Sequence, residues 1–195
     1  MKFYESGDSS KPVIFLFPGT CCLYSSFDHI LDGLHSYFYT VTVSYDGFDP
    51  NEKTEFYSME DECEKIEQEI KKKYDGRIKA AYGCSLGGSF VSLLIQRKRI
   101  HIDHGIIGSS DMDEAGNLVA KIQASMVVPF MYKMIHTGAL PKFMQKKLNK
   151  TDEVKKELYN GFLNMFGIGK GGSPWITKQS IYNQFYSDLV TKVQH

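Results

Sequence analysis

The chain has 195 residues, of which 42% are hydrophobic and 13% aromatic, and this composition is typical of a folded domain with a substantial core. Lysine plus arginine and aspartate plus glutamate balance at 23 each, so the overall charge creates no strong field that would recruit nucleic acid or an anionic membrane. The first residues lack the apolar core of a signal peptide, and we expect no stretch with the length of a membrane span. We therefore expect a cytoplasmic protein with no nucleic-acid partner and no integral membrane segment.

The cysteines show no spacing that is typical of a metal site; they stand at positions 21, 22, 63 and 84. The adjacent pair Cys21 and Cys22 is a poor disulfide framework, which favours reduced thiols packed as small core residues. We expect neither a metal ion nor another cofactor.

The first part of the chain alternates between strand and helix patterns. Residues 12–17, PVIFLF, form a continuous apolar run, which is typical of a strand buried on both faces. Ser25 or Ser26 is predicted to cap a helix, because apolar side chains recur at helical spacing directly afterwards. Residues 39–43 are β-branched or aromatic and predict a second strand, which a polar turn containing Asp46 closes.

The next unit contains a catalytic motif. Ser58 and Asp61 resemble a capping box and predict the start of a helix that ends near the lysines 71–73. Residues 78–82 then form an apolar run that leads into Gly83-Cys84-Ser85-Leu86-Gly87, a match to G-x-S-x-G. An apolar-periodic segment follows at once, so the pentapeptide is expected on a strand-to-helix turn.

Such a turn has a chemical use. The serine sits on a strained elbow with its hydroxyl above the carboxyl edge of the sheet, and small flanking residues are needed because a Cβ would collide. The helix that follows offers its N-terminus to the oxyanion that forms when the serine attacks a carbonyl. Ser85 is therefore a candidate nucleophile. The alternative, a turn with an idle serine, stays open because the pentapeptide alone is a weak signal.

A further strand is predicted near 102–107, and the alternation over the first part of the chain indicates an α/β fold with a mainly parallel sheet and helices on both faces. In such sheets ligands bind beyond the carboxyl ends of the strands. The residues that follow predicted strand ends should share one rim; they are Thr20, Asp46, Ser85 and Asp111.

The alternation stops after this point and helical patterns dominate. We predict helices over 118–135, with a break at Pro129, over 140–148 and over 151–166. Residues 167–172 contain G-x-G-x-x-G, but no strand precedes them in a βαβ unit, so a loop is a better interpretation than a dinucleotide site.

A last helix is predicted to start at Ser173-Pro174. Its expected buried stripe consists of Ile181, Phe185, Leu189 and Val193.

These patterns divide the chain into a core over 1–112, a helical lid over 113–173 and a helix over 174–195 that returns to the core. Most of the methionines fall at residue 112 or later, before the last helix, and their unbranched side chains suit a mobile apolar surface. Methionines that merely fill a core are an equally good explanation.

The segments PVIFLFPGT, VTVSYDGF, AAYGCSLGG and HGIIGSSD, in this order, resemble the α/β-hydrolase family over roughly residues 12–111. The resemblance implies that Ser85 is the nucleophile. It also implies an oxyanion hole made by the backbone N–H of Leu86 and that of Thr20 or Cys21.

The resemblance also has departures. The family usually has His-Gly where this chain has Pro18-Gly19, although a backbone donor does not depend on that histidine. Asp111 is the candidate acid that would orient the base, with a turn or capping aspartate as the alternative. No histidine occupies the family's position for the base, which leaves His136, His195 or a missing base.

The leading hypothesis is a serine hydrolase of esterase or lipase type that cleaves an acyl ester, with an apolar acyl group, through an acyl-Ser85 intermediate. An acyltransferase that uses the same intermediate is a close variant. The alternative from another class is a catalytically silent, hydrolase-like module for binding or self-association.

In the family, the helix after the lid leads to two further strands, whereas this sequence stops at His195. We therefore expect a C-terminally shortened hydrolase in which the strand near 102–107 has an unpaired apolar edge. The last helix, the lid or a second copy of the chain, giving a homo-oligomer, is expected to mask that edge.

Overall fold

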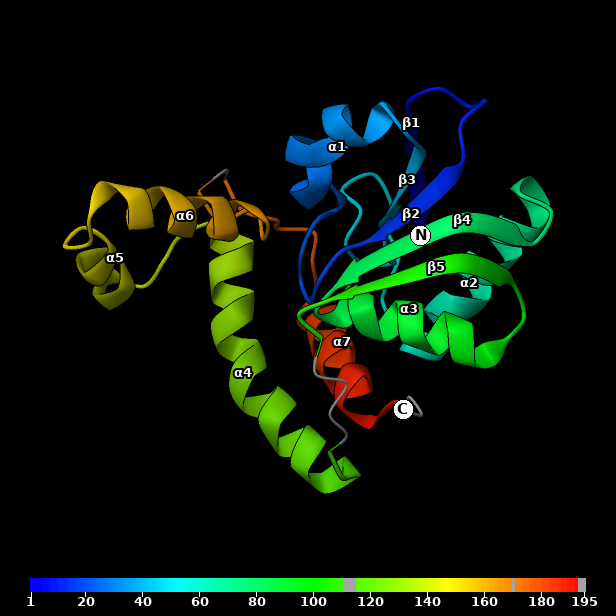
Figure 1. Cartoon of the computed structure of the whole chain (residues 1–195). Coiled ribbons are helices and arrows are strands. Elements are labelled where there is room, and N and C mark those ends of the chain that lie inside the picture. Colours follow the sequence, from blue (N-terminus) through cyan, green and yellow to red (C-terminus); the bar gives the residue numbers. More distant parts are fainter. Residues whose placement is uncertain (111–114, 170, 193–195) are drawn as a thin grey trace.

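The computed structural model describes residues 1–110, 115–169 and 171–192 (Figure 1). One five-stranded sheet has the order β1-β3-β2-β4-β5, with β1 antiparallel to β3 and all other neighbours parallel. The strands are β1 (Lys2–Ser6), β2 (Val13–Phe17), β3 (Tyr39–Ser44), β4 (Arg77–Cys84) and β5 (His101–Gly108). The helices are the 3-10 helix η1 (Tyr24–Phe27), α1 (Asp28–His35), α2 (Met59–Lys73), α3 (Leu86–Arg97), α4 (Asn117–Thr137), α5 (Lys142–Leu148), α6 (Glu153–Asn164) and α7 (Lys178–Val190). The α/β fold class is confirmed.

Strand β2 shows why its sequence is a continuous apolar run. Ile14 and Leu16 pack into the cluster on the α1 face, whereas Phe15 and Phe17 pack into the larger cluster with α2 and α3. All four side chains are buried. Helices therefore cover both faces of the sheet centre, and Figure 1 shows α1 and α3 on opposite sides of it.

Strand β1 is absent from the sequence-based prediction. Its five residues pair with β3 in antiparallel register, from Lys2 opposite Ser44 to Ser6 opposite Thr40. The strand lies at a sheet edge and is mostly half-buried, so it lacks the apolar run that identifies the central strands.

The predicted helix starts have different outcomes. Ser58 caps α2 as expected, because its Oγ accepts the N–H of Asp61 at 3.1 Å. The prediction that Ser25 or Ser26 caps a helix is wrong. Both serines lie inside η1, and α1 begins at Asp28 without a side-chain cap. The apolar spacing locates α1 correctly, but a turn of 3-10 helix precedes it.

The predicted start of the last helix at Ser173-Pro174 is also wrong. Thr177 caps α7 by accepting the N–H of Ser180 at 3.0 Å, four residues later than predicted. Ser173 instead closes a turn, since its carbonyl accepts the N–H of Ile176 at 3.1 Å. Pro174 lies within that turn.

The face that α7 buries is partly polar. Ile181 is fully buried as predicted, and its buried neighbours on the helix are Ser180, Gln184 and Ser187. Phe185 and Leu189 are only half-buried, and Val193 lies outside the described residues. Two of these polar side chains accept hydrogen bonds from loops of the core, as Ser180 Oγ does from the N–H of Phe56 at 3.2 Å.

Helix α4 corrects two expectations. It runs through Pro129 without the predicted break, so the helix tolerates the lost N–H. Among the described residues it is also the one helix that is long and apolar enough to cross a membrane, with 21 residues and a mean hydropathy of 1.2. The expectation that no stretch reaches that length is therefore wrong.

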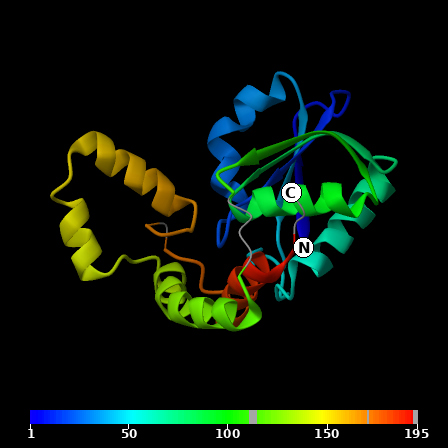
Figure 2. The same cartoon turned by 60° about the horizontal axis from the view of Figure 1, so that its bottom comes forward.

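Helices α4, α5 and α6, residues 115–169, form what we call the helical lobe, which lies on the side toward which β5 points (Figure 2). In the glycine-rich segment, residues 167–169 and 171 form turns, in keeping with the predicted loop. It satisfies backbone groups at the end of α4, since Gly169 N–H donates to Gly138 O at 2.9 Å. Directly after it, Ser173 N–H donates to Ile135 O at 2.7 Å.

Strand β5 is the last strand of the described sheet, and β4 is its one strand neighbour there. Ile106 and Ile107 remain 47% and 42% exposed. The expected apolar edge is confirmed, but neither the last helix nor the lobe masks it, because α7 packs against α4 and α2 instead.

Candidate functional site

Ser85 stands at the junction of β4 and α3. Its backbone has φ 54° and ψ −124°, a conformation that residues other than glycine rarely adopt. The N–H of Ser85 donates to Gly108 O at 2.8 Å, and its carbonyl accepts the N–H of Gly88 at 2.7 Å. The end of β5 and the first turn of α3 thus hold the strained residue in place.

The two motif glycines are required by space. A Cβ on Gly83 would lie 1.9 Å from the carbonyl oxygen of Gly87. A Cβ on Gly87 would lie 2.0 Å from the carbonyl oxygen of Phe17. The chain therefore folds back on itself with no room for a side chain, which is the geometry that the G-x-S-x-G pattern predicts.

The loop after β2 touches this elbow. A Cβ on Gly19 would lie 3.5 Å from Ser85 Cβ, so the two backbones are in close contact. Within the described residues, the structure records no acceptor for the N–H of Thr20 or of Leu86. Neither amide thus has a recorded partner that would exclude its predicted role as a donor to an oxyanion.

The candidate donor Cys21 is excluded. Its N–H donates to Gln184 Oε1 at 2.8 Å in a buried hydrogen bond, so it has no capacity left for an oxyanion. Cys21 also has φ 60°, and the turn around it is closed by Cys22 N–H donating to Gly19 O at 3.0 Å. Gln184 thus fixes a strained turn beside Ser85.

Gln184 is the residue that the sequence-based reasoning missed. It is fully buried, and its Nε2 has no hydrogen-bond partner among the described residues. The available signal was a polar residue three positions after Ile181, on the face that α7 was expected to bury.

Three of the four cysteines are buried away from solvent. All four are free, and Cys21, Cys22 and Cys63 are buried. Burial raises the pKa of Cys22 to about 12, so this thiol stays protonated at neutral pH. The expectation of reduced thiols in the core is confirmed for these three, whereas Cys84 is free but only partly buried.

Four histidines lie on other elements of the core. His35 Nε2 bonds to Ser6 Oγ at 2.9 Å, and His101 Nε2 lies 3.1 Å from Asp103. His29 is exposed on α1 and His104 is exposed on β5. None of the four has a recorded contact with Ser85.

His136 lies in the last turn of α4 and packs against Tyr132 with the ring centroids 5.0 Å apart and the ring planes tilted by 33°. Its Nδ1 is buried without a hydrogen-bond partner, and no bond to Ser85 is recorded. The candidate acid Asp111 and the other candidate base, His195, lie outside the described residues.

The rim residue Asp46 follows the end of β3 as expected, whereas the expected lid does not cover Ser85. Asp46 forms an ion pair with Lys65, and its carboxylate is buried. Ser85 itself is exposed, so the helical lobe does not close over it. Among the described residues, no cluster of histidine, cysteine and carboxylate side chains could hold a metal ion.

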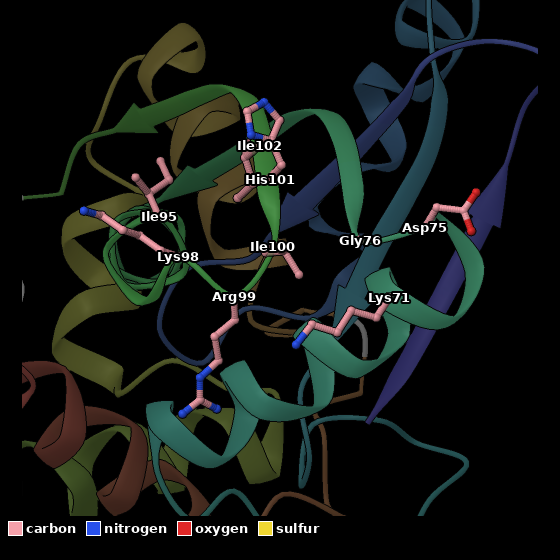
Figure 3. Close-up of a pocket in the computed structure, with 9 residues that line it drawn as sticks. All are labelled: Lys71, Asp75, Gly76, Ile95, Lys98, Arg99, Ile100, His101 and Ile102. Atoms are coloured by element: carbon pink, nitrogen blue, oxygen red, sulfur yellow. The ribbon is translucent and has the colours of Figure 1, made fainter.

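Two of the hollows formed by the described residues lie beside the core. A basic pocket of about 870 Å³ contains Lys71, Lys98, Arg99 and His101 (Figure 3). It lies at the amino ends of β4 and β5, away from the carboxyl ends that carry Ser85. A groove of about 780 Å³ separates α1 from α6.

No family model matches the sequence, and no curated protein matches it either. Solved structures do share the fold. A protein from Desulfitobacterium hafniense, provisionally assigned to the alpha/beta hydrolase family, superimposes with a TM-score of 0.71 at 16% identity over 97% of this chain and 72% of its own. A carboxylesterase structure from Nitrososphaera gargenis superimposes with a TM-score of 0.68 at 14% identity. The superposition covers 98% of this chain and 68% of the carboxylesterase.

A thermophilic esterase from Thermogutta terrifontis gives a TM-score of 0.69 at 14% identity, over 96% of this chain and 66% of its own. This chain thus spans 66–72% of the length of these proteins. The strand order, the elbow at Ser85 and these superpositions agree, and the chain has the α/β-hydrolase fold.

Proposed function

We propose that the protein is a serine hydrolase of esterase or lipase type, which cleaves acyl esters through an acyl-Ser85 intermediate. The observation that carries the proposal is the strained elbow, which exposes Ser85 where the loop at Gly19 meets the first turn of α3. Esterases and other hydrolases among the superimposed structures support hydrolysis as the reaction class.

In the proposed reaction, Ser85 Oγ bonds to the ester carbonyl carbon, and the carbonyl oxygen becomes an oxyanion. The free N–H groups of Leu86 and Thr20 would donate to it, and loss of one such donor costs roughly 10²–10³ in rate. The alcohol leaves with the proton that Ser85 gives up. Water then adds to the acyl carbon, the carboxylic acid departs, and Ser85 regains a proton.

A base must carry these protons, and His136 and His195 remain the candidates. His136 has the stronger support, because its buried Nδ1 lacks a partner and a histidine ring is the usual carrier. Asp111 remains the candidate for orienting that base.

The proposed acyl group is apolar. Apolar side chains line the α6 side of the groove between α1 and α6, namely Val154, Leu158, Phe162 and Met165. Polar groups such as Ser26 and His29 occupy the opposite wall, which suits a substrate with an apolar tail and a polar ester.

A second candidate function is a catalytically silent module for binding or self-association. The specific observation in its favour is that no described histidine contacts Ser85. The exposed edge of β5 would provide a surface for association with a second copy.

A fluorophosphonate probe separates the two functions. The enzyme predicts covalent labelling at Ser85, loss of labelling in Ser85→Ala, and hydrolysis of p-nitrophenyl esters that the same variant abolishes. Ser109 is a matched control, because it is also exposed, follows a strand and has a positive φ of 50°. Ser109→Ala should leave labelling unchanged.

If the folded protein is not labelled, the hydrolase proposal is wrong and the silent module stands. If His136 is the base, His136→Ala should slow labelling by about 10²-fold or more. An unchanged rate would eliminate His136.

A further inference from the structure

Helix α4 has an apolar surface where a soluble helix is expected to be polar. Leu118, Ile122, Met126 and Phe130 recur every four residues, so they form one stripe along the helix. Their side chains are 73%, 53%, 75% and 42% exposed in that order. Four large apolar side chains in a row thus face water.

The opposite side of α4 already has its packing partner. Ala120, Ala124 and Val128 are buried, and α4 packs on α7. The exposed stripe is therefore a second apolar face and does not belong to the core. The contact with α7 also holds α4 on the domain surface, which argues for a helix lying against a membrane rather than crossing it.

The part of the lobe that contains this stripe has charges of one sign. Residues 115–151 contain six lysines and no aspartate or glutamate; the lysines are Lys121, Lys133, Lys142, Lys146, Lys147 and Lys150. The whole lobe, 115–169, has eight lysines against three acidic residues. The other described residues have 14 lysines and arginines against 17 acidic residues. The net charge of zero is therefore the sum of a basic lobe and a more acidic core.

We propose that the helical lobe docks on an anionic lipid surface. The stripe on α4 would enter the boundary between headgroups and acyl chains, and the lysines would contact the anionic headgroups. Each lysine close to such a surface strengthens binding roughly fivefold, so several act together. Pairing with a second copy is disfavoured, because two lobes placed stripe to stripe would bring two lysine-rich segments together.

The test is co-sedimentation with vesicles of phosphatidylcholine, with and without phosphatidylglycerol. We expect binding only to the vesicles that contain phosphatidylglycerol, and we expect added salt to weaken it. The triple variant Lys142→Glu, Lys146→Glu and Lys147→Glu should lower the partition coefficient on the order of a hundredfold. The double variant Ile122→Ser and Met126→Ser should lower it by about tenfold or more.

Matched controls come from the core. The triple variant Lys53→Glu, Lys71→Glu and Lys72→Glu changes three exposed lysines by the same charge, and Tyr57→Ser removes a side chain that is 65% exposed. Both should bind vesicles like the unchanged protein. Ser85→Ala should also bind normally, so failure of this proposal and failure of the proposed hydrolase activity are distinguishable.

Three results would overturn the proposal. The first is no binding to phosphatidylglycerol vesicles, and the second is an equal loss in lobe and core variants. The third is a dimer in sedimentation velocity that the Ile122→Ser and Met126→Ser changes dissociate, which would make a second copy the occupant of the stripe.

Discussion

The core and the helical lobe use apolar side chains in different ways. In the core, strand β2 packs against helices on both faces, and large side chains such as Phe15 and Phe17 are fully buried. In the lobe, α5 and α6 bury no side chain completely, and α4 buries mainly the side that faces α7. The core is therefore stabilised by its own packing, whereas the lobe presents its apolar residues outward. The predictions below test this contrast.

The largest expected effect compares a glycine in each region. Gly87→Ala places a Cβ 2.0 Å from the carbonyl oxygen of Phe17, and we expect a loss of at least about 4 kcal/mol in the free energy of unfolding. In Gly161→Ala, on α6, the added Cβ has no neighbour within 4 Å, so this substitution should raise the free energy of unfolding by up to about 1 kcal/mol. Urea unfolding measures both. Similar midpoints for the two variants would refute the steric account of the elbow.

Two methionines sharpen the contrast. Met59 is fully buried in the first turn of α2, whereas Met126 is 75% exposed on α4. Met59→Ala should cost roughly 2–5 kcal/mol through lost burial and a cavity, and Met126→Ala should cost less than about 0.5 kcal/mol. Thermal unfolding decides whether the lobe methionines are core filler, in which case both losses would be large.

The third prediction concerns a buried charge in the core. Glu62 accepts the N–H of Asp46 at 3.0 Å and pairs with Lys65 at 3.0 Å, yet burial raises its pKa to about 7 from an ordinary 4.5. The folded state then holds this proton more tightly than the unfolded state, so stability is lost as the pH rises from about 4.5 to about 7.

Glu62→Gln removes that titration. Relative to the variant, the unchanged protein should lose on the order of 3 kcal/mol between about pH 5 and about pH 8. Denaturant unfolding of both proteins at these pH values measures the difference. Parallel pH profiles would show that Glu62 is not the titrating group.

The smallest predicted effect concerns the hydrogen bond from α7 to the loop beside Ser85. Gln184→Leu leaves the buried N–H of Cys21 without an acceptor, which should cost about 2 kcal/mol and slow labelling of Ser85. Gln179→Leu, on the exposed side of the same helix, is the matched control and should change stability by less than about 0.5 kcal/mol. Equal effects would mean that the buried bond has no special role.

The central strands and the elbow were predictable because their constraints are local. A strand buried on both faces must be apolar throughout, as residues 13–17 are, and a chain that folds back beside Phe17 must have glycine there. The cap at Ser58 was predictable for the same reason, since donor and acceptor lie within one turn.

The features that escaped prediction depend on distant partners. Gln184 is buried because of Cys21, which is 163 residues away in the chain. The start of α7 moved to Thr177 because Ser173 bonds to the end of α4. The edge strand β1 depends on its pairing with β3 more than on its own pattern. The catalytic base stays a prediction, because no local pattern marks it.

The charge of the molecule is distributed unevenly, with a basic lobe and a slightly acidic core. Its isoelectric point of about 7.0 suggests that it should pass through an ion-exchange column near neutral pH. A sulfonate resin, however, interacts with the part of the protein surface that faces it. Salt screens electrostatic interactions beyond about 10 Å at 0.1 M ionic strength, so charges on the far side of the protein contribute little. The protein should therefore bind to the sulfonate resin through its basic lobe. The salt concentration at which it elutes should depend on the charge of the lobe and not on the net charge of the whole protein.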